Sequence, residues 1–274
     1  MYIDELAGVL VGEEQDLATI SSYFDSDRVL PEYLELAVLE RIFAQLQLPL
    51  PFSVEEALAA LPREFVTAAV SQLNTMFTGE SASYEHHHLS YLLYYFPVNV
   101  FKVWKPLFDL QLGHTLKPNL KVLDVGSGPG SVPLGLVEYF KALAESFPQI
   151  SFSLSFTLLE AEQTFLEIAG ALLETSKRVA PANLKIELAG LHRIELATAL
   201  PNLPEYDLIT FSNFFTTNEG NNRTNALPLL QDAKRHLAPD GSIIIIEPGQ
   251  SKQCHSLKRL RNEVVNNNLF QVYA

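Results

Sequence analysis

The stretch KVLDVGSGPGSVPLGL places an acidic residue and three glycines at the end of a short apolar run. Asp124 stands two residues before Gly126, and Gly128 and Gly130 follow in the order G-x-G-x-G. Glycine lets a backbone approach a bound molecule closely, because a Cβ would intrude on that space. A carboxylate beside such a loop disfavours a phosphate and favours a cation. These residues predict a loop that binds a nucleotide-like ligand carrying positive charge.

Two common nucleotide-binding loops differ from this pattern. A dinucleotide fingerprint reads G-x-G-x-x-G, so its third glycine comes one position later. A P-loop ends in G-K-[ST], which this stretch lacks. The pattern therefore disfavours a nicotinamide dehydrogenase and a P-loop enzyme. S-adenosylmethionine carries an ammonium and a sulfonium group and no phosphate, so it suits an acidic glycine loop.

From residue 119 the chain alternates between patterns typical of strands and of helices, which predicts an α/β fold. Strands are expected at residues 120–126, 151–160, 184–190, 206–214 and 242–249, helices at 131–147, 161–179, 226–237 and 251–268, and a last short strand at 269–274. The run SIIIIEPG predicts a central strand covered on both faces, after an APDG turn. The alternation predicts a doubly wound parallel sheet, with the ligand beyond the carboxyl ends of its strands.

The first part of the chain differs in charge and in pattern. Residues 1 to 100 contain 15 Asp and Glu against 3 Lys and Arg, whereas the whole chain has a net charge of −13. Pro31 and the Ser53/Glu56 pair are typical of helix starts, so we expect an all-helical region over 1–85. It could cover a cleft, carry substrate specificity or form a homodimer contact. The second domain is expected over 86–274.

A leading helical stretch, HLSYLLYYFPVNVFKVWKPLFDLQLG, should join the two parts. Pro97 should break or restart this helix because it lacks a backbone donor, and Gly113 should end it. Its aromatic residues are expected in the core, with a few of them as an alternative lining for a ligand pocket.

Composition restricts the class of protein further. With 47% hydrophobic residues the chain can form a sizeable core, and no apolar run approaches the roughly 20 residues needed to cross a bilayer. The acidic N-terminus is unlike a secretory signal. Cys254 stands alone, and the consecutive histidines at 86–88 do not share a helix face, so no metal site is expected. We therefore expect a soluble, cytoplasmic protein that binds no membrane.

Residues 119–249 resemble class I S-adenosylmethionine-dependent methyltransferases. VLDVGSGPG is similar to the first motif of that family, FTLLEAEQTFLEIA to its second, and HLAPDGSIIIIEPG to a later turn and strand. The resemblance implies a Rossmann-like sheet, S-adenosylmethionine as cofactor and direct methyl transfer to an acceptor. The implied cofactor-binding residues are Asp124, Gly126, Ser127, Gly128 and Gly130 around the methionine part, Glu160 on the ribose, Leu191 near the adenine, and Ser212 and Asn213 facing the methyl group.

Several of these assignments have competitors. Glu162 is an alternative to Glu160, and Leu191 stands where the family often has an acid. Candidates for a general base or a polarising group are Asn213, Glu219, Arg223, Glu247 and His192. Each has a structural alternative; Glu247, for example, could simply bond a neighbouring loop. No catalytic residue is assigned.

A narrower resemblance links YYFPVNVFKVWKPLFDL, SNFFTTNEGNNR and IIIIEPG to methyltransferase-like proteins of the small ribosomal subunit, including the mitochondrial one. It implies the ribosomal small subunit or RNA as a partner, although the sequence lacks a recognisable seventh, antiparallel strand. Three functions therefore remain open. They are methyl transfer to a small molecule or protein, RNA methylation or ribosome association, and a non-catalytic assembly role. The basic segment KRLR at 258–261 favours RNA only if it is not one face of an amphipathic helix.

Overall fold

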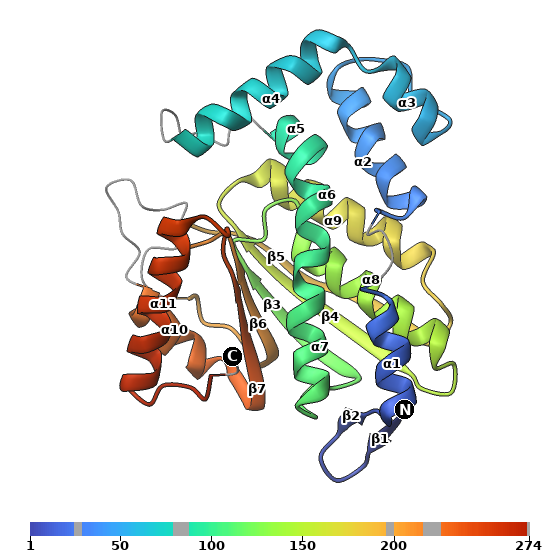
Figure 1. The fold of residues 1–274 in the computed structure, drawn as a ribbon. Coiled ribbons are helices and arrows are strands. Elements are labelled where there is room, and N and C mark those ends of the chain that lie inside the picture. Colours follow the sequence, from blue (N-terminus) through green and yellow to red (C-terminus); the bar gives the residue numbers. More distant parts are fainter. Residues whose placement is uncertain (25–28, 79–87, 196–199, 216–225, 273–274) are drawn as a thin grey trace.

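The fold combines a parallel sheet, flanking helices and an N-terminal helical layer, as Figure 1 shows. The structure, a computed structural model, describes residues 1–24, 29–78, 88–195, 200–215 and 226–272. No helix in these ranges is long and apolar enough to span a membrane.

Five strands form the central sheet: β3 (Asn119–Val125), β4 (Phe152–Glu160), β5 (Leu184–Arg193), β6 (Tyr206–Ser212) and β7 (Leu237–Ile246). All neighbours are parallel, in the order β5-β4-β3-β6-β7. The crossover helices are α8 (Ser131–Ser146), α9 (Gln163–Arg178) and α10 (Ala226–Arg235), and α11 (Ser251–Asn266) follows β7. This confirms the predicted doubly wound, Rossmann-like α/β fold.

The strand order fixes where a ligand can bind. The chain moves outward from β3 to β4 and β5, then returns past β3 to form β6 and β7. The two halves therefore diverge between the carboxyl ends of β3 and β6. A crevice at such a topological switch point is the usual binding site of an open parallel sheet. The glycine loop begins at this point, directly after β3.

Two expectations about the last part of the sheet were wrong. Strand β7 has β6 as its one neighbour in the described part of the chain, so it is an edge strand and not a central one. Its apolar run reflects cover by helices on both faces, which hydrophobicity cannot distinguish from pairing on both edges. The APDG residues fall within the bounds of β7 but pair with no residue of β6, because the register shifts between Leu237 and Ser242; with Asp240 at φ +61°, the chain turns there as predicted. Residues 269–272 are not a strand.

The N-terminal region is not all-helical. A short hairpin of β1 (Tyr2–Asp4) and β2 (Val9–Val11) precedes α1 (Glu14–Ser22), α2 (Glu32–Gln45), α3 (Val54–Ala60) and α4 (Arg63–Thr78). Pro31 is the N-cap residue of α2 and Ser53 is that of α3, as expected of residues at helix starts. The Ser53 side chain accepts a hydrogen bond from the backbone N–H of Glu56. The hairpin was missed because its strands are three residues long, too short for a recognisable alternation.

A buried polar cluster fastens the helical layer to the sheet domain. The Tyr33 hydroxyl of α2 bonds Glu138 of α8 and lies 3.2 Å from the Ser176 hydroxyl of α9. Lys141 pairs with Glu138 and lies 4.2 Å from the centre of the Tyr33 ring. Apolar residues of α2 also share one continuous core with α8 and α9. The predicted division at residue 85 remains a prediction, but the two parts pack together without a separating layer of solvent.

The leading helical stretch has a more varied course than expected. It consists of α5 (His88–Ser90), a π-helical turn η2 (Tyr91–Tyr95), α6 (Phe96–Val100), a 3-10 turn η3 (Phe101–Val103) and α7 (Trp104–Leu112). The α-helical geometry restarts at Phe96, so Pro97 falls in the first turn of α6, where its missing donor costs little. Gly113 ends α7, as predicted.

A very close helix contact holds this stretch against α8. A Cβ added to Gly135 would lie 2.0 Å from the carbonyl oxygen of Val100 and 2.7 Å from a Val103 side-chain carbon. The Trp104 indole donates a hydrogen bond to the Gly135 carbonyl at 2.9 Å. Because α8 begins at the glycine loop, this contact also sets how close the leading stretch comes to the loop.

A Gly135→Ala variant should therefore unfold more easily. We expect a loss of about 1–3 kcal/mol in the free energy of unfolding, because the added methyl group meets backbone that cannot yield. Urea unfolding followed by circular dichroism measures it. Gly249→Ala is the control, since no atom lies within 4 Å of a Cβ placed there. Equal effects of the two substitutions would contradict the close-contact explanation.

Candidate functional site

The glycine loop is fastened to the end of β4. The backbone N–H groups of Gly126 and Ser127 both donate to the Leu159 carbonyl, at 2.8 and 3.0 Å. The next residue along β4 is Glu160, whose Oε2 accepts a hydrogen bond from the Gly128 N–H at 2.7 Å. The sequence could not show this second contact. It brings the predicted ribose-binding acid and the predicted methionine-binding loop into one site.

The three glycines have different surroundings. A Cβ on Gly126 would lie 2.5 Å from the Phe214 ring, and one on Gly130 would lie 3.1 Å from Ala169 of α9. At Gly128, which has φ +52°, nothing lies within 4 Å of such an atom. Gly126 and Gly130 therefore serve the packing of the loop itself. Gly128 is the position where the backbone borders open space that a ligand could enter.

Asp124 is a buried carboxyl group with an unused oxygen. It is 1% exposed on β3, and its Oδ1 accepts a hydrogen bond from the Thr210 hydroxyl of β6 at 2.5 Å. Its Oδ2 is buried and has no hydrogen-bond partner among the described residues. Burial, together with the nearby charge of Glu160, raises the pKa of Asp124 to about 7, although the Thr210 hydrogen bond opposes the shift. An ionised Asp124 thus lacks the partner that a buried charge requires.

Glu160 ends β4 at the same edge of the sheet. In addition to Gly128, its carboxylate accepts hydrogen bonds from the backbone N–H groups of Ala161 and Glu162, at 2.8 and 3.1 Å. Burial raises the pKa of Glu160 above its ordinary value, while the backbone donors oppose that shift. Its competitor Glu162 is the N-cap residue of α9. Of these two acids, Glu160 is the one whose side chain accepts a hydrogen bond from the glycine loop in the described structure.

The end of β6 lies beside the loop. Strands β3 and β6 are paired from Val122 to Val125, so Ser212 and Asn213 extend just past the loop's first residue. Asn213 has φ +52°, and its N–H donates to the Ile246 carbonyl of β7 at 2.8 Å. Phe214 then places its ring against Gly126. The predicted methyl-facing residues therefore share the switch point with Asp124 and the glycines.

Glu247 bonds a neighbouring loop, which was the structural alternative to a role as general base. Its Oε1 accepts hydrogen bonds from the backbone N–H groups of Phe214 and Phe215, at 3.1 and 2.9 Å. It thereby supports the loop after β6, which carries Asn213. A general-base role for Glu247 is not needed to explain its position.

Leu191 does not follow the third strand of the sheet, as expected, but lies within it. Strand β5 continues to Arg193 because residues 190–193 pair with β4 again after a register shift. The Leu191 side chain packs 3.1 Å from a Cβ placed on Gly170 of α9, and it is 40% exposed. His192 is likewise in this edge strand and exposed, not in a loop. Whether either residue touches a ligand remains a prediction.

Some predicted positions lie outside the described residues, namely Glu219, Arg223, His86 and His87. Within the described ranges, no group of three or more His, Cys, Asp or Glu side chains is arranged to hold a metal ion. The KRLR segment lies on α11, with Lys258, Arg259 and Arg261 exposed and Leu260 buried. The segment therefore belongs to an amphipathic helix whose bases are exposed and whose leucine packs inward.

Buried polar atoms without partners gather around the loop. In the described part of the chain they include Asp124 Oδ2, Ser127 Oγ and Asn99 Oδ1, while Ser131 lies against the Tyr91 hydroxyl. Their residues are all between 1% and 6% exposed. Folded proteins rarely leave such atoms unsatisfied, so a cluster of them at a switch point indicates a polar ligand. Ser131 and Asn99 were not predicted as site residues, because no motif marks a serine after the glycines or an asparagine in a helix.

Tyr91 is a further residue that the sequence placed in the core. Its ring lies 5.6 Å from that of Phe165 in the first turn of α9, and its hydroxyl accepts a hydrogen bond from Asn99 at 3.0 Å. Burial raises the pKa of Tyr91, and the charge of Glu160 adds to this shift. The leading stretch therefore reaches the switch point through Tyr91. A tyrosine among many apolar and aromatic residues gives no sequence signal of such a role.

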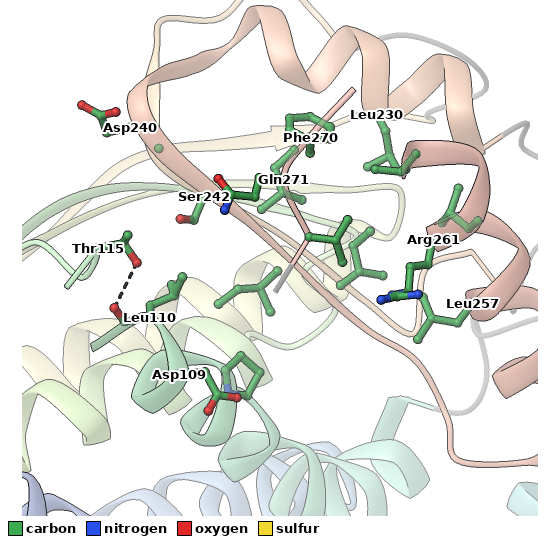
Figure 2. A pocket seen from close by; sticks show the side chains of 18 residues that line it. Asp109, Leu110, Thr115, Leu230, Asp240, Ser242, Leu257, Arg261, Phe270 and Gln271 are labelled. Carbon is green, nitrogen blue, oxygen red and sulfur yellow. Dashed lines mark hydrogen bonds between the residues drawn. The ribbon is translucent and has the colours of Figure 1, made fainter. Parts of the chain in front are cut away.

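A cavity on the other side of the sheet edge is not part of this site. It has a volume of about 570 Å³ and runs between α7, the edge of β7, α11 and residues 270–272. Figure 2 shows Asp109 and Thr115 on its α7 side and Arg261 and Leu257 on its α11 side. None of the predicted cofactor-binding residues lines it. The candidate site is thus identified by its unsatisfied polar atoms and by its position at the strand ends.

Comparison with known proteins gives structural matches alone. No protein-family model matches this chain, and no curated protein matches it. Similar solved structures include an S-adenosylmethionine-dependent methyltransferase from Methanosarcina mazei (19% identity, TM-score 0.34, covering 57% of this chain and 63% of that one). Another, from Geobacter sulfurreducens with S-adenosylhomocysteine, has 21% identity and a TM-score of 0.31, and covers 52% of this chain and 47% of that one.

The plantazolicin methyltransferase BpumL has 14% identity and a TM-score of 0.32, with 78% of this chain and 58% of that one covered. This chain spans about half the length of these proteins. At such identities and TM-scores the matches carry no weight for the activity of this chain. Its Rossmann-like fold, which is the fold expected of a class I methyltransferase, follows from its own strand order.

The buried charge predicts how an Asp124→Asn variant behaves without ligand. At pH 8 Asp124 is ionised in both the folded and unfolded states, so folding bears the full cost of burying its charge. The neutral amide removes that cost, and we expect about 1 kcal/mol greater stability. The gain should shrink as the pH falls from about 7 toward 3.8, the range in which folded Asp124 is protonated and the unfolded one is not.

Thermal unfolding between pH 4 and pH 8 measures this difference. Asp207→Asn is the matched control, because Asp207 pairs with Lys117 at 2.7 Å and its loss should lower stability. An Asp124→Asn protein that is less stable than wild type at pH 8 would show that Asp124 is a structural acid.

Proposed function

We propose that this protein is an S-adenosylmethionine-dependent methyltransferase. The observation that supports this most directly is the buried, half-partnered Asp124 beside a glycine loop that borders open space at Gly128. Two carboxyl groups, Asp124 and Glu160, lie at this loop, and each has a raised pKa. A pyrophosphate would meet repulsion there. A ligand with an ammonium group and ribose hydroxyls would satisfy the unpaired carboxylate oxygen instead.

The residues present fit this cofactor. Asp124 Oδ2 would accept hydrogen bonds from the ammonium group, and the backbone at Gly128 admits the ligand without a side chain in the way. Glu160 Oε2 keeps a lone pair beyond its bond with Gly128, which a ribose hydroxyl can use. The sulfonium supplies an activated methyl group when the cofactor is bound. The task of the protein is then to position the acceptor and to exclude water, which such a reaction chiefly requires.

We favour a small molecule or a protein as methyl acceptor. Residues 101–274 hold 17 acids and 16 bases, and the first hundred residues are strongly acidic, so neither part offers the basic surface that nucleic acid usually requires. The bases of α11 lie on one face of an amphipathic helix. The alternatives are a ribosome-associated RNA methyltransferase and a non-catalytic assembly factor. We further infer a cytoplasmic protein whose acidic helical layer provides either substrate specificity or a homodimer contact.

Calorimetric titration with S-adenosylmethionine tests the proposal. We expect micromolar binding that an Asp124→Asn variant loses by at least about tenfold, since a hydrogen bond to a charged partner is removed. Binding should also tighten as the pH rises through about 7, because Asp124 then becomes ionised. NAD serves as the comparison ligand. Tighter binding of NAD than of S-adenosylmethionine would refute the proposal.

The alternatives have their own readouts in the same preparation. Affinity for RNA that falls steeply with salt concentration would favour the ribosome-associated function. Cofactor binding without methyl transfer to RNA, protein or small-molecule pools would favour the assembly role. Transfer of labelled methyl groups to one of these pools identifies the acceptor class directly.

A further inference from the structure

Tyr91 lies near the first residues of two helices, α8 and α9. The ring contacts Phe165 in the first turn of α9, while α6, directly after the π-helical turn, packs against α8. The hydroxyl also has side-chain hydrogen bonds with Ser131, the first residue of α8, and with Asn213, and both lower its pKa. The hydroxyl thus lies beside the start of α8 and beside Asn213, the residue that follows β6.

Asn99 controls the direction of that hydroxyl. Its Nδ2 donates to the Tyr91 oxygen at 3.0 Å, from a side chain that is 3% exposed. An oxygen that accepts this bond retains its own proton for donation. Tyr91 can therefore donate that proton to Ser131, to Asn213 or to a ligand in the site.

Two more hydroxyl groups lie at the same helix terminus. Ser127 and Ser131 are 6% and 5% exposed; Ser127 Oγ has no hydrogen-bond partner among the described residues, and Ser131 lies against the Tyr91 hydroxyl. Helix α8 begins at Ser131 and is 16 residues long, so the N-terminal end of its dipole adds positive potential there. Hydroxyl donors at a helix N-terminus form an environment for an anion. Neighbouring Asp124 and Glu160 instead favour positive charge, so the site is suited to a ligand that carries both.

We propose that Tyr91, oriented by Asn99, binds the carboxylate of the amino-acid part of the bound ligand together with the Ser131 hydroxyl. This assignment rests on the proposed function, since an S-adenosyl amino acid carries an ammonium and a carboxylate on the same carbon. It gives the leading stretch a direct part in the site. It also explains why its α-helix widens at Tyr91–Tyr95, because π-helical turns occur frequently at functional sites, where they redirect a side chain.

Two ligands separate the amino-acid end from the nucleoside end. S-adenosylhomocysteine has the carboxylate, whereas 5′-methylthioadenosine has the same adenosine and thioether without it. Removing the hydroxyl in Tyr91→Phe should weaken binding of S-adenosylhomocysteine by about tenfold or more. Binding of 5′-methylthioadenosine should change less than about twofold, because the ring and its packing remain. Calorimetry on the full chain measures both affinities.

Tyr94→Phe is the matched control, since this neighbouring tyrosine is 54% exposed and belongs to the same turn. It should leave both affinities unchanged, and thermal unfolding should show that both variants are folded. An equal loss of both ligands in Tyr91→Phe, or no loss of either, would refute the Tyr91 assignment alone. Wild-type protein that binds neither ligand would refute the proposed function as well.

Discussion

The turn from β3 into α8 is the constraint on which the candidate site depends. Two consecutive N–H groups, of Gly126 and Ser127, donate to one carbonyl at the end of β4, and the Glu160 carboxylate bonds the loop again at Gly128. Glycine is favoured at position 128 because the backbone there has a positive φ. The space beside it is open, and glycine places no side chain in it. This double attachment holds the strand ends, the loop and the start of α8 in one arrangement, and every other site residue is placed relative to it.

The site is built at a cost to the stability of the folded chain. Asp124 is buried with one oxygen unpartnered, and the nearby charge of Glu160 raises its pKa further. The Ser127 hydroxyl and the Asn99 side-chain oxygen are also buried without partners in the described part of the structure. A fold that sought stability alone would replace these groups with apolar ones. Their presence at a topological switch point is best explained by a ligand that satisfies them.

The helical layer contributes more than cover for the sheet. It is fastened to α8 and α9 by the buried Tyr33 and Glu138 contact, and the leading stretch reaches α8 at Gly135, where backbone touches backbone. Rigid attachment at these two places allows Tyr91 to enter the site at a defined position. The acidic surface of the layer and the site therefore belong to one packed body with a shared core.

The sequence by itself determined the alternation of strands and helices, the glycine loop and the acids at the strand ends. These are local signals: strand and helix periodicity, turn residues, and a motif with fixed spacing. Its strand pattern predicted a ligand at the carboxyl ends of the strands, near Asp124 and Glu160, and its resemblance to methyltransferases added Ser212 and Asn213. It also predicted Gly113 and Ser53 as helix ends, since capping depends on neighbouring residues.

Only the tertiary structure decided which strand is at the edge, which atoms lack partners and which residues enter from elsewhere. The apolar run of β7 suggested a central strand, but hydrophobicity reports cover by helices and not the pairing of strand edges. Leu191 lies within β5, because this strand pairs with β4 again after a register shift. Tyr91 and Asn99 reach the site through packing of α6 on α8, a contact between segments distant in sequence. Such contacts depend on shape complementarity across the whole fold, which no local pattern records.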